Sequence, residues 1–235
     1  MQKNTAATVQ EHIQNNLSTI LQEKIEIVGC GRTDTGVHAK QYYAHFDTEK
    51  SDLQQNKQHW LFKLNKISSP DIAFHDLQKV HESASARFDA LSRTYEYHIH
   101  QQKNVFLVDY SWLCSIDFNL EKMNEAASYL LNVEDFTSFS KVNTQTHTNN
   151  CKVFIAVWKK ENDKLIFTIK ANRFLRNMVR AIVGTLLDVG EGKTNLEEFK
   201  NIVQSKNRNN AGKSVPAHGL YLTEIEYPTT IFIGE

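Results

Sequence analysis

The sequence predicts an α+β fold with a mainly antiparallel sheet. Helical and strand-like segments interleave without the regular strand, helix, strand rhythm of a parallel sheet. Two strand-like runs at 151–158 and 164–170 are joined by the short turn Glu161-Asn162-Asp163, as in a hairpin. The 235 residues, 40% hydrophobic and 23% charged, can bury a substantial core, which excludes disordered and fibrous classes.

Capping and periodicity predict the elements of the first part of the chain. Thr8 and Glu11 have the spacing of a capping box, and apolar residues follow at helical intervals. A polar loop punctuated by glycine covers 31–38. The expected elements are helices at 8–23 and 52–66, strands at 25–28, 42–46 and 93–100, and an extended segment at 72–80. The alternation in the last strand puts Arg93, Tyr95, Tyr97 and Ile99 on one face.

The second part repeats the mixture of helix and strand. Asn119 is expected to cap a helix that runs to about Leu130, and a long polar loop with Phe136 and Phe139 follows at 132–150. After the hairpin come helices at 172–189 and 196–204 and a strand at 220–227. In the first of these helices Arg173, Arg176 and Arg180 would form one stripe.

The charges balance overall but not locally. Lysine and arginine total 27, as do aspartate and glutamate, so the molecule has no net field that would attract a polyanion. Between Lys170 and Lys213, however, the sequence contains nine basic residues and only four acidic ones. This excess fits a surface that faces phosphate groups, and it equally fits the solvated face of a helix.

Membrane spans, export and metal sites are not indicated. The most apolar stretch, 178–189, is interrupted by Arg180 and Asp188 and is shorter than the roughly 20 residues that a membrane-spanning helix needs. The first residues contain no apolar signal core, so we expect a cytoplasmic protein. The three cysteines are Cys30, Cys114 and Cys151. Their odd number and the lack of C-x-x-C spacing indicate reduced thiols rather than disulfides or a zinc site.

Asp34 is the first candidate for chemistry. It lies on a bent loop between Arg32 and Gly36, where a nearby guanidinium favours the ionised carboxylate that a nucleophile requires. An aspartate that only shapes the turn is an equal alternative. Asp34-Thr35-Gly36 also matches the triplet of aspartic proteases, but only one triplet is present and no apolar strand precedes it directly.

Other patterns are less specific. The face with Arg93, Tyr95 and Tyr97 could stack a base and hold a phosphate, or be part of the core. His98 and His100 share a strand face without a third metal ligand nearby. The sequence contains no P-loop, dinucleotide fingerprint or serine elbow, so reactions that need ATP, nicotinamide or flavin have no support.

Four motifs together resemble the tRNA pseudouridine synthase A family. The string G-R-T-D-T-G-V-H-A begins at Gly31, R-x-Y-x-Y at Arg93 and D-F-T-S-F at Asp135. The string F-L-R-N-M-V-R follows at Phe174, with Gly184 and Gly190 after it. The resemblance covers about residues 8–227, and the first string is highly specific. It implies a pseudouridine synthase fold of two ferredoxin-like halves, 1–83 and 84–235, around a central cleft.

The resemblance implies roles for six residues. Asp34 corresponds to the essential carboxylate, Arg180 to the arginine that pairs with it, and Tyr95 to the tyrosine that packs on the target base. Arg32 corresponds to the arginine that holds the flipped nucleotide, and Arg87 and Phe88 match a pair that contacts RNA. The implied substrate is uridine at positions 38, 39 and 40 in the anticodon stem-loop of tRNA, bound by a homodimer.

The implied reaction suits these residue types. Isomerising uridine to pseudouridine gains and loses no group and changes no oxidation state, so neither a cofactor nor a metal is expected. The carboxylate attacks either C1′ or C6, and the sequence leaves both open. A flipped base needs an inserted side chain and a flat stacking partner, which Arg32 and Tyr95 could supply. The alternative is a non-catalytic RNA-binding module with the same fold.

The sequence departs from the family in three places. Ser85 stands where a histidine usually contacts RNA, and the loop at 143–147 is nearly neutral where many members are basic. The usual first strand and its Y-x-G-x-x-Y-x-G-W-Q segment are reduced to Gln2. Losing that strand would leave buried backbone groups unpaired, so we expect a misassigned start or a truncation, with about 20–30 further residues in the native protein.

Overall fold

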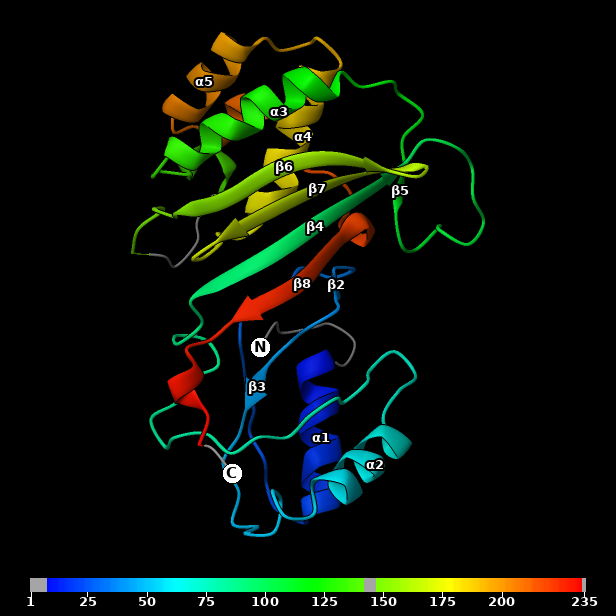
Figure 1. Ribbon diagram of the computed structural model, residues 1–235, viewed down its shortest axis with the longest axis vertical. Helices are drawn as coiled ribbons and strands as arrows, with labels where there is room; N and C mark the ends of the chain where they lie inside the picture. The colour runs from blue at the N-terminus through cyan, green and yellow to red at the C-terminus, as the bar shows by residue number, and fades with distance from the viewer. Residues whose placement is uncertain (1–7, 142–146, 234–235) are drawn as a thin grey trace. The chain divides into compact units, whose positions relative to one another are not determined.

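The computed structural model of the chain describes residues 8–141 and 147–233, and their contacts divide them into two units (Figure 1). Unit 1 holds residues 8–32, 43–90 and 227–233 of the described chain. Unit 2 holds residues 33–42 and 91–226. The segment 33–42, which contains Asp34, therefore packs with the later part of the chain. Gln2 and most of the loop at 143–147 lie outside the described residues.

Unit 1 is built around two helices and a small sheet. Helix α1, Val9–Leu21, begins where the Thr8 side chain accepts a hydrogen bond from the Glu11 backbone N–H, as the sequence predicts. Its other regular elements are helix α2, Lys57–Ile67, and the antiparallel strands β1, Val28–Gly29, and β3, Ala44–His45. The core consists of Leu17, Leu21, Ile25, Ile27, Trp60 and Leu64.

Unit 2 contains one larger sheet with helices on one face (Figure 1). The strand order is β2, β8, β4, β7, β6, and β5 pairs separately with β4. The strands are β2, His38–Ala39; β4, Ser92–His100; β5, Trp112–Leu113; β6, Val153–Glu161; β7, Lys164–Ala171; and β8, Leu220–Glu226. Only the β2–β8 and β4–β5 pairs in the described chain are parallel. The predicted α+β class with a mainly antiparallel sheet is confirmed.

The helices of unit 2 follow from their caps and their apolar faces. Helix α3, Leu120–Tyr129, is capped by Asn119, and helix α5, Leu196–Gln204, begins at a complete capping box of Asn195 and Glu198. Helix α4, Met178–Gly190, is buried on almost every side. Phe136 and Phe139, which the sequence places in a polar loop, are fully buried in the core of unit 2. Phe136 precedes a short 3-10 helix, Thr137–Phe139, and Phe139 ends it.

Three predicted elements are wrong in extent. The helix expected at 172–189 begins only at Met178, because Asn177 adopts a left-handed conformation with a φ of 66° that interrupts a helix. Arg173 and Arg176 therefore share no helical stripe with Arg180. The strands expected at 25–28 and 42–46 are reduced to β1 and β3. In the segment 72–80, which the sequence predicts to be extended, Val80 forms an isolated antiparallel bridge with Phe232.

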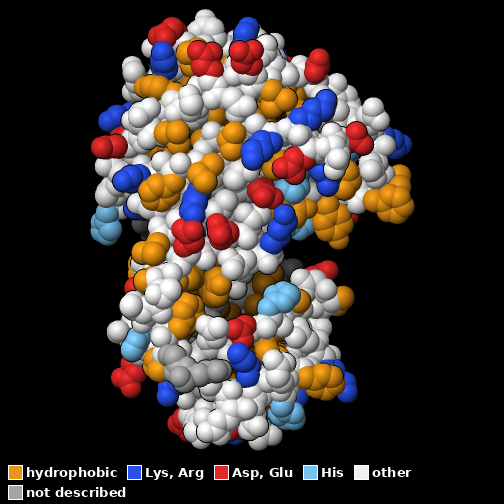
Figure 2. Space-filling view, viewed as in Figure 1, with side chains coloured by type: hydrophobic (Ala, Val, Ile, Leu, Met, Phe, Trp, Pro, Cys, Tyr) orange, Lys and Arg blue, Asp and Glu red, His pale blue; other side chains and the backbone are white. Residues whose placement is uncertain are grey.

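The three cysteines are buried and form no disulfide with one another, and burial raises the pKa of Cys151 to about 11. In the described part of the chain, no helix has the length and apolar character that crossing a membrane would require. On the face seen in Figure 2, basic and acidic side chains are interspersed, in agreement with the balanced composition.

Candidate active site

Asp34 and Arg180 form an ion pair within unit 2. Arg180 Nη1 donates a hydrogen bond to Asp34 Oδ2 at 3.0 Å. The Asp34 side chain is 28% exposed and that of Arg180 is 21% exposed. A charged pair that is partly shielded from water, yet still accessible, can contact a ligand directly.

The Asp34 loop is fixed to the sheet by backbone pairing. Val37 N–H donates to the Asp34 carbonyl at 3.1 Å, which closes a turn in which Gly36 takes a positive φ of 84°. Strand β2 then pairs in parallel with β8, and the His38 ring stacks on Tyr221 at 4.7 Å between centroids. The carboxylate is therefore held on a rigid element.

The Arg180 guanidinium is fixed by a second contact. Its Nε donates to the Val215 carbonyl at 2.7 Å, and Val215 N–H donates to the Arg180 carbonyl at 3.2 Å. The hydroxyl of Tyr97 donates to the neighbouring Pro216 carbonyl at 2.8 Å. Burial raises the pKa of Tyr97 above its ordinary range, so this hydroxyl remains a neutral donor.

The segment 208–216, which carries Val215, lies directly against helix α4. The Arg208 guanidinium donates to the carbonyls of Ala211 and Gly212, which folds the segment on itself. Gly184 permits this contact, because an added Cβ there would lie 1.8 Å from the Lys213 carbonyl oxygen. No motif in segment 208–216 predicts its contact with helix α4. The sequence signal that could have indicated this close contact is Gly184, a glycine within an apolar helix.

Tyr95 and Phe174 form an aromatic pair in the same unit. Their rings meet edge to face with 5.0 Å between centroids, and both side chains are half-buried. Across the sheet, Leu222 of β8 is the register partner of Tyr95 on one side and of Ala39 on the other. Tyr95 therefore lies two strands, about 10 Å, from the strand that follows the Asp34 loop.

The remaining predicted site residues belong to unit 1. Arg32 is exposed at the end of its segment, and Phe88 is 78% exposed with the Arg87 guanidinium 5.3 Å from its ring centroid. The Arg87–Phe88 turn is anchored because Ala86 N–H donates to His45 Nδ1 at 3.0 Å and the Tyr227 hydroxyl donates to the Ala86 carbonyl. The roles of Arg32, Arg87 and Phe88 stay predictions.

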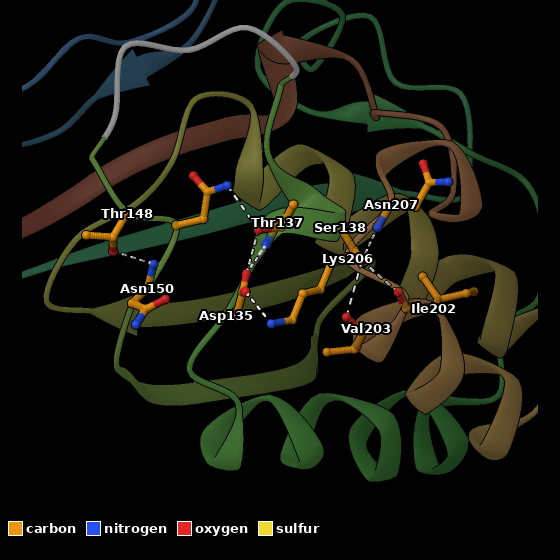
Figure 3. Close-up of polar contacts among 10 residues, drawn as sticks. Asp135, Thr137, Ser138, Thr148, Asn150, Ile202, Val203, Lys206 and Asn207 are labelled. Atoms are coloured by element: carbon orange, nitrogen blue, oxygen red, sulfur yellow. Dashed lines mark hydrogen bonds and ion pairs between the residues drawn. The ribbon is translucent and has the colours of Figure 1, made fainter.

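A polar cluster holds the D-F-T-S-F motif in place (Figure 3). Asp135 Oδ1 accepts from the Thr137 N–H and hydroxyl, and its Oδ2 pairs with Lys206 Nζ at 2.9 Å. The Ser138 hydroxyl donates to the Ile202 carbonyl at 2.7 Å. Burial raises the pKa of Asp135, but the Thr137 hydrogen bonds and Lys206 outweigh it and hold the pKa below its ordinary value. This motif is structural.

Of the two histidines on β4, His98 is linked to an acidic residue that also binds a lysine. His98 Nε2 lies 2.9 Å from Glu96 Oε2, which also pairs with Lys40 at 3.1 Å. Burial lowers the pKa of His98 and outweighs the opposing effect of Glu96. Among the described residues, no group of three or more histidine, cysteine, aspartate or glutamate side chains could hold a metal ion.

Comparisons with known proteins point to a single family. Residues 126–228 match the family model described as tRNA pseudouridine synthase. Proteins named tRNA pseudouridine synthase A from Bacteroides fragilis and Parabacteroides distasonis are each 45% identical to this chain over 96% of its length and 89% and 88% of their own. The protein of that name from Bacillus pumilus is 40% identical over 94% of this chain and 90% of its own length.

Proposed function

Because this chain belongs to the tRNA pseudouridine synthase family, we propose that it isomerises uridine to pseudouridine at positions 38, 39 and 40 in the anticodon stem-loop of tRNA. The observation that carries the proposal is the ion pair of Asp34 and Arg180 at 3.0 Å. It joins the carboxylate of one motif to the arginine of another, 146 residues along the chain.

In the proposed reaction the uridine N1–C1′ bond breaks and a C5–C1′ bond forms, while C5 loses a proton and N1 gains one. Asp34 is the nucleophile, and its attack at C1′ or at C6 fits the residues equally. Arg180 keeps the carboxylate oriented and supplies the adjacent positive charge. No atom enters or leaves the substrate overall, so the residues alone can account for the chemistry.

The target base must leave its stack before it reacts. We assign its stacking partner to Tyr95, which Phe174 holds in place from the edge. We assign the insertion and holding of the flipped nucleotide to Arg32, and a further RNA contact to Arg87 and Phe88. The exposed Phe88 ring, with a guanidinium beside it, is suited to contact with a base.

The protein is proposed to act as a homodimer that binds one tRNA across both subunits. The proposal follows from the family resemblance. A single subunit has a formal net charge of zero, whereas a dimer would bring two copies of the basic stretch 170–213 around one tRNA. A cytoplasmic location, predicted from the sequence, is part of the same proposal.

The direct test incubates the protein with unmodified tRNA and maps pseudouridine in the anticodon arm. Asp34→Asn should abolish pseudouridine while tRNA still binds, because the substitution removes the charge and keeps the size of the side chain. Asp163→Asn, in the exposed β6–β7 turn, is the matched control. A wild-type protein that binds tRNA and leaves it unmodified would instead establish the RNA-binding module.

A further inference from the structure

Five basic residues from separate segments of unit 2 gather at one end of its sheet. Asn172 joins three of these segments: its carbonyl accepts from Arg93 Nη1 at 3.2 Å, its side-chain oxygen accepts from Lys152 N–H at 2.8 Å, and its own N–H donates to the Lys152 carbonyl. The Arg176 carbonyl accepts from Lys141 N–H at 3.1 Å. We call this set the basic rim: Arg93, Lys141, Lys152, Arg173 and Arg176.

Four of the five basic-rim residues have no carboxylate close to their charged groups in the described part of the chain. Within the described residues, no carboxylate lies within 4.0 Å of Lys141, Lys152, Arg173 or Arg176. The carboxylates of Asp135 and Glu226 are instead paired with Lys206 and Lys170. Lys141, Lys152 and Arg176 are exposed, and the remaining two are half-buried. Glu134 is exposed and lies near Lys152, because its carbonyl accepts a hydrogen bond from Cys151 N–H. Its single negative charge would not cancel the positive charges of the basic rim.

The basic rim adjoins the candidate active site. Arg93 precedes Tyr95 by two positions on β4, so both side chains share one face of the strand. Phe174, which packs on Tyr95, lies between Arg173 and Arg176 in the chain. Helix α4 then starts at Met178 and presents Arg180 to Asp34 within its first turn. The cations of the basic rim therefore lie next to the aromatic pair of Tyr95 and Phe174.

Phe154 adds an exposed aromatic ring to the same end of the sheet. A register shift between Val153 and Ile155 marks a bulge in β6 at this position. The ring is 43% exposed, and Lys152 Nζ lies 5.8 Å from its centroid. Cations that alternate with exposed aromatic rings are the arrangement that binds unpaired nucleotides, since the cations hold phosphates and the rings stack on bases.

We propose that the basic rim binds backbone phosphates of the tRNA next to the reacting uridine, and that Phe154 stacks on a neighbouring base. The inference rests on the proposed function and specifies the surface that holds the substrate. A polyanion of regularly spaced phosphates fits cations drawn from several segments, whereas one small anion would not engage all of them.

The test measures tRNA affinity as a function of salt concentration for Lys152→Ala, Arg176→Ala and Phe154→Ala. Each lost cation should weaken binding about 3- to 10-fold at physiological salt and reduce the slope of log affinity against log salt by about 0.7–0.9. Phe154→Ala should weaken binding about 5-fold or more with no change in slope, because stacking releases no counterions.

Lys159→Ala and Lys160→Ala are the matched controls. Both lysines are exposed on β6, the strand that follows Lys152, and they lie about 25 Å from it along the strand. They remove the same charge from the same unit and should leave both affinity and slope unchanged. Thermal melting of each variant verifies that the fold is retained.

Pseudouridine formation by the wild-type protein is measured in parallel, so that the two proposals fail separately. If the wild type modifies tRNA but Lys152→Ala and Arg176→Ala bind as the controls do, the basic rim is overturned and the function stands. If affinity depends on the rim as described but no pseudouridine forms, the function is overturned and the rim stands as an RNA-binding surface.

Discussion

A single guanidinium makes both contacts that define the candidate site. Arg180 donates through Nε to the Val215 carbonyl and through Nη1 to the Asp34 carboxylate, so its plane is fixed at two points. Arginine provides these donors in a rigid fork, whereas lysine presents one compact ammonium on a flexible stem. The position therefore requires the geometry of arginine and not just its charge.

Arg180→Lys should reduce kcat/KM for tRNA modification by about 10- to 100-fold, the equivalent of about 1.5–3 kcal/mol for one charged hydrogen bond. Steady-state kinetics with unmodified tRNA measures this effect, and Arg180→Ala should be at least as impaired. Retention of full activity by Arg180→Lys, with a folded protein by circular dichroism, would show that charge alone suffices.

At the scale of elements, helix α4 and segment 208–216 act as one support for Arg180. Gly212 N–H donates to the Thr185 hydroxyl at 2.9 Å, and the Lys213 carbonyl lies against Gly184, where any side chain would overlap it. The two backbones approach so closely because glycine is present at both positions. The carbonyl of Val215 reaches Arg180 as a result.

Gly184→Ala should destabilise the protein by about 3 kcal/mol or more, since its Cβ would lie 1.8 Å from a backbone oxygen that cannot rotate away. Urea unfolding measures the loss. Gly31→Ala is the control, because nothing lies within 4 Å of an added Cβ at that position. Equal stability of the two variants would refute the close packing of α4 and segment 208–216.

The cluster around Asp135 should make stability depend on pH. Its pKa is lower in the folded protein than the ordinary 3.8, so the ionised carboxylate stabilises the fold above that value and the effect disappears as pH falls through the folded pKa. Asp135→Asn should cost about 1 kcal/mol at neutral pH, and this difference should shrink below about pH 3.8. Melting temperatures of both proteins across this range check the sign, and a difference independent of pH contradicts it.

For the molecule as a whole, we expect a dimer whose two subunits are both needed for tight tRNA binding. Light scattering gives the mass in solution, and titration with tRNA gives one tRNA per dimer if the expectation holds. A monomer that binds tRNA with full affinity would be incompatible with it. The measurement is informative because a dimer would bring two copies of the basic stretch 170–213 to one tRNA, whereas a monomer offers only one.

Local rules predicted the elements that depend on local chemistry. The caps at Thr8 and Asn119 fix helix starts through neighbouring atoms, and the hairpin of β6 and β7 follows from alternation and a short turn. The start of α4 was missed because its apolar periodicity continues back through 172–177. Only the left-handed backbone of Asn177, an outcome of tertiary packing, separates that segment from the helix.

The pairing of Asp34 with Arg180 was predictable only through the family resemblance, although the local residues had already singled out Asp34. No spacing or periodicity connects Asp34 with Arg180, since their distance depends on the pairing of β2 with β8. The carbonyl of Val215 carries no side-chain signal, and the basic rim combines residues from segments that the sequence separates. Contacts of this kind arise from topology, which composition and motifs do not encode.

The assignment of residues 33–42 to unit 2 has a consequence for dissecting the protein. A single cut between residues 43 and 90 would leave Asp34 and Arg180 on different fragments, so neither fragment alone would hold the ion pair. After such a cut, Asp34 would be retained beside Arg180 by non-covalent contacts alone, including β2–β8 pairing and the hydrogen bond from Lys40 N–H to the Leu222 carbonyl. Complementation between the two fragments would therefore measure the strength of β2–β8 pairing together with the reassembly of unit 1, whose residues 8–32 and 227–233 would also lie on different fragments.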